Sequence, residues 1–91
     1  MYFAEQEISL RNAVLASEAG MMAIKSGETE FDLSRLSIAD SSTVAVMLSW
    51  QRAASQQGKT LDFHAIPESL NSLLALYGLT ELLGLTKQHQ S

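Results

Sequence analysis

The pattern of apolar residues predicts a first helix over residues 12–25. Leu15, Ala19 and Met22 recur at i, i+4 and i+7, which is the spacing of one apolar helix face. Gly20 lies inside this segment and weakens a helix by about 1 kcal/mol relative to alanine. We therefore expect packing against the rest of the protein, rather than intrinsic helix propensity, to hold this helix in place.

Two further helices follow from the same kind of pattern. Residues 41–57 carry two adjacent apolar rows, so the nonpolar arc is unusually wide for a helix with one face in solvent. The first row is Val44, Met47, Leu48 and Ala54, and the second is Val46, Trp50 and Ala53. A third helix is predicted after Pro67, which a first helical turn accepts, and Gly78 ends it.

Short alternating segments between the helices predict β-strands. One strand is expected within residues 2–10, a second over residues 29–33 and a third over residues 60–65. Residues 79–85 form either a short last turn or a further strand. Because strands alternate with helices, we expect right-handed crossovers and a small, mostly parallel β-sheet with α-helices packed on it. The predicted fold class is therefore α/β.

Length and composition limit the class of protein. The chain makes a single domain over residues 1–91, in which we expect residues 1–6 and 86–91 to be loosely ordered. No cysteine is present, which excludes disulfides and thiolate metal sites. A net charge of −4 with only six Lys and Arg leaves no basic patch for nucleic acid. Without a signal-peptide pattern or a bilayer-spanning run, we expect a cytoplasmic protein with no direct membrane insertion.

The main candidate site is the start of the second predicted helix, Asp40-Ser41-Ser42-Thr43. The first turn of a helix leaves backbone N–H groups without intrahelical partners and carries the positive end of the helix dipole. Asp40 is therefore a good N-cap, and a phosphate on Ser41 or Ser42 would be stabilised there. The simplest interpretation of an Asp followed by serines remains an ordinary helix cap.

Other candidate chemistry is sparse. His64 and His89 are the only histidines, and neither has a cysteine or a second histidine at ligand spacing, so we expect no metal site. The serine pair has no neighbouring histidine or lysine to act as a base. Asp32 and Asp40 flank one turn, and we interpret them as a strand-end acid and a helix cap rather than a catalytic pair. The sequence therefore predicts no catalytic residues and no cofactor.

Trp50 is the only tryptophan, and two interpretations of it stay open. Tryptophan is enriched among the residues that dominate protein–protein binding, and Trp50 lies to the side of the first apolar row, where a partner could reach it. Alternatively, Trp50 is a core residue under the sheet. We include it with the helix start among the candidate partner-binding residues.

The sequence resembles STAS domains from about Glu7 to Leu83. The similarity is carried by a strand end, the turn into the following helix, the break after that helix, and a closing block. These are Asp32-Leu33-Ser34, Asp40-Ser41-Ser42, Gln57-Gly58-Lys59 and Ser72 to Leu79. The resemblance implies the STAS fold, with the amino-terminal strand pair shortened here to about one strand.

The closing block is similar to that of the small STAS subunits of the Mla system, which maintains outer-membrane lipid asymmetry. This similarity implies a non-catalytic cytoplasmic subunit that binds and supports the ATPase of a phospholipid ABC transporter, and that is peripheral at the inner membrane through this partner. The alternative within STAS domains is an anti-sigma-factor antagonist, whose partner is an anti-sigma-factor serine kinase.

Each of the two alternatives gives a role to one serine of the pair, by its position in the family pattern. Ser41 matches the hydroxyl that the Mla subunits place against their ATPase, and Ser42 matches the phosphorylated serine of the anti-sigma-factor antagonists. Thr43 stands where the family pattern usually has glycine. We expect its bulk to lie where a kinase-type partner would approach, which disfavours the anti-sigma-factor alternative.

Overall fold

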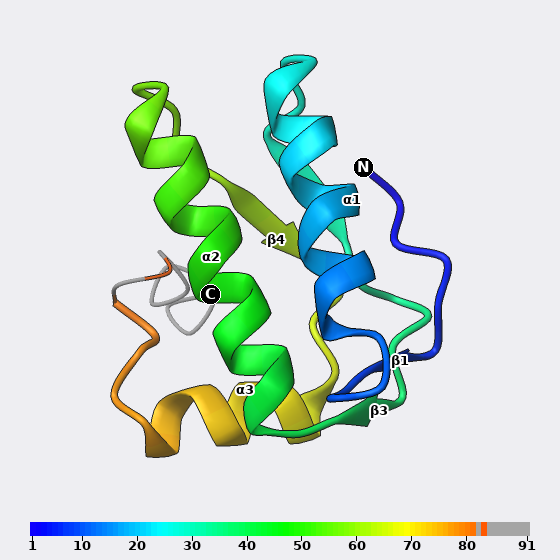
Figure 1. Ribbon diagram of the computed structural model, residues 1–91. Coiled ribbons are helices and arrows are strands. Elements are labelled where there is room, and N and C mark those ends of the chain that lie inside the picture. The colour runs from blue at the N-terminus through cyan, green and yellow to red at the C-terminus, as the bar shows by residue number, and fades with distance from the viewer. Residues whose placement is uncertain (82, 84–91) are drawn as a thin grey trace.

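The computed structural model describes residues 1–81 and residue 83 (Figure 1). Its elements are β1 (Glu7–Ile8), α1 (Ala13–Lys25), β2 (Glu30–Asp32), β3 (Ile38–Ala39), α2 (Ser41–Gln56), β4 (Asp62–His64) and α3 (Glu68–Leu76). All three predicted helices are confirmed close to their expected ends. None of the helices in this part of the chain is long and apolar enough to cross a membrane.

The strands form two small parallel pairs. β1 pairs with β3, where Glu7 lies opposite Ile38, and β2 pairs with β4, where Phe31 lies opposite Phe63. The expected α/β class with parallel strands is confirmed, although the pairing is divided between two sheets. The hydrophobic pattern does not predict β3, because a strand of two residues is too short to show alternation.

The first residues of the chain pack against β2, which differs from the loose order expected for residues 1–6. Tyr2 forms an isolated parallel bridge with Asp32, and the ring of Phe3 is buried. The Phe3 N–H donates to the Asp32 carbonyl oxygen at 3.0 Å. An aromatic core position therefore fixes this segment. Residues 86–91, the other segment expected to be loose, lie outside the described residues.

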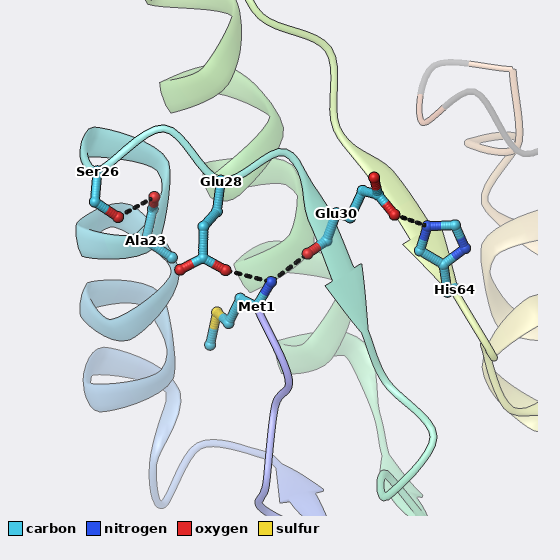
Figure 2. A network of polar contacts seen from close by, with 6 residues as sticks. All are labelled: Met1, Ala23, Ser26, Glu28, Glu30 and His64. Carbon is cyan, nitrogen blue, oxygen red and sulfur yellow. Dashed lines mark hydrogen bonds and ion pairs between the residues drawn. The ribbon is translucent and has the colours of Figure 1, made fainter.

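A polar network joins the terminal amine to β2 and β4 (Figure 2). The Met1 ammonium group pairs with the Glu28 carboxylate and donates to the backbone carbonyl oxygen of Glu30. The Glu30 side chain lies 3.2 Å from His64 Nε2 across the β2–β4 pair. Both of these side chains are more than half exposed, so solvent screens the contact and it contributes little to the free energy of unfolding.

α1 and α2 lie side by side over the β2–β4 pair, with their N-termini at the same end of the molecule (Figure 1). Trp50 of α2 is fully buried at their contact. Its Nε1–H is shared between the carbonyl oxygens of Ala16 and Ser17 on α1, each 3.2 Å away. Its ring meets the edge of Phe31 from β2 at a centroid distance of 5.0 Å. The tryptophan thus joins both helices to the sheet.

Gly20 is required by this packing. A Cβ atom at position 20 would lie 2.0 Å from Trp50 Nε1, well inside van der Waals contact. The glycine that weakens the isolated helix is therefore what allows α1 to approach the indole ring. The structure thus shows the packing contact that the sequence leads us to expect for this helix.

The buried face of α1 is not the apolar stripe that predicts the helix. Leu15 and Met22 are 69% and 72% exposed. The buried residues are mostly small, namely Ala16, Gly20, Ala23 and Ile24. The size of Trp50 explains the difference, because only small side chains fit between α1 and an indole that reaches its backbone. The large apolar side chains of α1 are left on its outer surface.

The remaining helices follow the sequence more closely. Members of both apolar rows of α2 are buried, as the wide nonpolar arc predicts: Val44, Val46, Met47, Trp50 and Ala54. α3 ends where Gly78 has a positive φ of 71°, and the Leu79 N–H donates to the Leu74 carbonyl oxygen at 2.9 Å. The following described residues form a turn, in which the Leu83 N–H donates to the Leu79 carbonyl oxygen.

Candidate functional site

α2 begins in a reciprocal N-terminal cap. Asp40 has an extended backbone, and its Oδ1 accepts the N–H of Ser42 at 2.8 Å. In return, the Asp40 N–H donates to Thr43 Oγ1 at 3.0 Å. Asp40 is therefore confirmed as the N-cap. Because both ends of the first turn are bonded, the backbone that carries the serine pair is fixed in one geometry.

The Thr43 hydroxyl also ties α2 to β1. It donates to the carbonyl oxygen of Ile8 at 2.5 Å, and Thr43 has no exposed surface. One hydroxyl thus accepts from the cap residue and donates to a strand. Its removal would leave the buried Ile8 carbonyl oxygen and the part-buried Asp40 N–H without these partners, and an unpaired buried polar group is destabilising.

The structure corrects the expected role of Thr43. Since the residue is wholly buried, it cannot meet a partner, and its place among the partner-binding residues is wrong. Its side chain points toward Ile8 and not toward the surface. The bulk of Thr43 therefore gives no argument against a serine kinase as partner. Its departure from glycine instead supplies the hydroxyl that completes the cap.

The two serines after the cap are placed differently. Ser41 is exposed, whereas Ser42 is half-buried at the edge of a groove between α1 and α2. The groove has a volume of about 290 Å³. It is lined by Leu10, Ala13, Val14, Ser17, Ser42, Ala45, Val46 and Ser49. The first turn of α2 therefore presents the exposed Ser41 hydroxyl to solvent and the Ser42 hydroxyl beside a groove lined by uncharged residues.

Trp50 belongs to the core, so its assignment to the partner-binding surface is wrong. Its exposed fraction is 0%, and its only polar atom is satisfied by α1. The helical position that sets Trp50 aside from the first apolar row directs it toward α1 and the rings of Phe3 and Phe31. Of the two open interpretations, the structure supports the core residue.

The two aspartates that flank the β2–α2 connection act locally, as interpreted from the sequence. Asp32 Oδ1 accepts the Ser34 N–H at 2.8 Å, just as Asp40 accepts the Ser42 N–H. The bonds from the Ser34 backbone and side chain lower the pKa of Asp32 below its usual value. Among the described residues, no group of three or more His, Asp and Glu side chains could hold a metal ion.

Sequence reasoning did not identify the groove itself. Two large apolar residues that line it, Leu10 and Val14, are 87% and 71% exposed. A signal was present, because α1 has only two charged residues, Glu18 and Lys25, and is apolar around most of its circumference. Helices of that kind are normally covered on all sides.

Comparison with known proteins finds a family match. A family model described as the Mlab STAS domain matches residues 6–85, which include the cap, both serines and the groove. No curated protein matches the chain significantly. The match covers most of the chain, and its bounds agree with the extent of the STAS resemblance in the sequence.

Proposed function

Since the chain belongs to the MlaB family of STAS domains, we propose that it is a non-catalytic subunit of an Mla-type phospholipid ABC transporter. In this role it binds the transporter ATPase in the cytoplasm and supports its activity. It is held at the inner membrane through that partner and contributes to outer-membrane lipid asymmetry.

The single observation that carries this proposal is the exposed Ser41 hydroxyl on a rigidly capped helix start. A fixed backbone loses little conformational entropy when it is covered by a partner, which favours binding. Ser42 and the adjoining groove extend the same surface without adding a charge. A surface of this kind suits a packed protein contact better than catalysis.

The alternative is an anti-sigma-factor antagonist controlled by phosphorylation of Ser42. One observation favours it: Ser42 lies in the first turn of α2, where the helix dipole stabilises an anion. The groove disfavours it, since no Lys or Arg is among the residues that line it. A phosphate on Ser42 would lose solvation there and meet no cation. We therefore prefer the transporter role.

Co-purification with the products of the neighbouring genes tests the proposal. We expect the tagged protein to recover an ABC-type ATPase, and its intact mass from cells to show no phosphate. Recovery of a serine kinase without an ATPase, together with phosphate on Ser42, would replace the transporter role with the alternative.

A further inference from the structure

The outer side of the α1–α2 pair is apolar and uncovered. Leu10 and Val14 are 87% and 71% exposed, although neither carries a polar atom on its side chain. The inner side of α1 is already filled by Trp50. Exposed apolar side chains that gather over one hollow mark interaction sites more often than scattered ones do. This surface is therefore a candidate for a partner rather than for the protein's own core.

The shape of the groove suits a helix. Its lining includes small side chains from both helices, among them Ala13 and Ser17 on α1 and Ala45 and Ser49 on α2. The hydroxyls of Ser17 and Ser49, both of which line the groove, lie 3.1 Å apart and join the two helices. Small residues let another backbone approach closely, and the valley between two parallel helices accepts a third one.

The groove itself is uncharged, but an exposed cation, Arg52, lies on the same face of α2. No charged residue is among those that line it, and Ser42 of the candidate site lies within it. Arg52 follows Ser49 by three residues, so the two share one face of α2. Arg52 is exposed, and no hydrogen bond or ion pair joins its guanidinium to another described residue. A partner that meets this face therefore gains from a carboxylate near Arg52.

We infer that the groove receives an amphipathic helix of the ATPase, which places small apolar side chains against Val14 and Ala45 and a carboxylate against Arg52. The inference rests on the proposed function and extends its contact from Ser41 and Ser42 along α2. The ATPase is the preferred occupant because Ser42 belongs both to the candidate site and to the lining of the groove, so a partner bound at the start of α2 continues into it.

The test measures binding of the purified ATPase subunit from the neighbouring gene to groove variants. We expect Ala45→Lys to fill the groove with a long charged side chain and to weaken binding at least about 30-fold. The matched control is Ala75→Lys, at an exposed position of α3, which should bind as the wild type does. Val14→Ser provides a second groove variant at an exposed site, with a smaller loss.

Arg52 provides the charge test. Arg52→Glu should weaken binding about 10-fold or more and Arg52→Gln by less, with the difference between them shrinking as salt is added. Melting curves of each free variant should match the wild type, since all three positions are exposed.

The outcomes separate this inference from the proposed function. If the wild type does not bind the ATPase, the proposed function is wrong and the inference falls with it. If Ser41→Glu abolishes binding while Ala45→Lys, Val14→Ser and Arg52→Glu bind as the wild type does, the function stands and the groove inference is wrong. If the wild type is a dimer that Ala45→Lys dissociates without changing ATPase binding, the occupant is a second copy and the inference is also wrong.

Discussion

The two sides of the α1–α2 pair differ in how tightly they are packed. On the inner side, Trp50 reaches the backbone of α1 at a position where only Gly20 leaves room for it. On the outer side, the same helices leave an open groove whose walls include Leu10 and Val14. The inner contact is fully buried, the indole N–H of Trp50 is hydrogen-bonded, and a larger residue at position 20 would clash with the ring. The outer surface is open to solvent, so substitutions there should affect folding little, and a partner could reach it.

The largest expected effect on stability is at Trp50. We expect Trp50→Ala to lower the free energy of unfolding by about 3–5 kcal/mol, because it removes a fully buried ring from three aromatic neighbours. Urea unfolding of the isolated protein measures this loss. The reciprocal change Gly20→Ala should also destabilise, since its Cβ overlaps the indole. An unfolding free energy of Trp50→Ala close to that of the wild type would contradict the core assignment.

The Thr43 hydroxyl should come next. Thr43→Val keeps the volume but leaves the Ile8 carbonyl and the Asp40 N–H without partners, at a cost of about 1–3 kcal/mol. Thr43→Ser keeps the hydroxyl and serves as the control, with a smaller loss. Equal stabilities of the two variants would show that the hydroxyl does not anchor the helix start.

The Asp40 cap should have a more moderate effect. We expect Asp40→Ala to cost about 1 kcal/mol, because it leaves the Ser42 N–H without its acceptor. Thermal or urea unfolding of the variant measures the loss, and Asp40→Asn is the control that keeps an acceptor oxygen. A variant Asp40→Ala as stable as Asp40→Asn would contradict the role of this side chain.

The smallest effect among the acids should be at Asp32. The Ser34 bonds favour its carboxylate, so its folded pKa lies below its unfolded value. Its contribution to stability is therefore present above about pH 4 and is lost as pH falls through the folded pKa. Carboxyl NMR titration should give a midpoint for Asp32 below 3.8, and Ser34→Pro, which removes the donor N–H, should raise it. A midpoint at or above 3.8 in the wild type would show that these bonds do not act in solution.

Structural features that depend on neighbouring residues can be predicted from the sequence, whereas features that depend on distant residues cannot. The three helices, the Asp40 cap and the parallel α/β class follow from periodicity and capping, which are properties of neighbouring residues. The buried face of α1 does not follow, because it is set by Trp50, a side chain 30 residues beyond Gly20 in the sequence. Thr43 illustrates the same limit, since its inward direction depends on the Ile8 carbonyl of a distant strand.

The cap at the start of α2 was predicted from the sequence, whereas the surroundings of this candidate site were not. The start of α2 and the serine pair are where the STAS resemblance puts them, while Thr43 and Trp50 lie inside the protein. The groove depends on how two helices pack, so no local pattern gives its position. Its only sequence signal is the scarcity of charge in α1.

The most direct test of a binding role for the outer surface is the affinity of Ser41→Glu for the ATPase. The variant should fold with a melting temperature close to that of the wild type, because an acid in the first turn of a helix suits its dipole. Ser69→Glu places the same change in the first turn of α3, away from the groove, and is the control. We predict that Ser41→Glu loses at least about 2 kcal/mol of binding free energy and fails to support ATPase activity, while Ser69→Glu keeps both. Undiminished binding and activity of Ser41→Glu would contradict the proposed role of this surface.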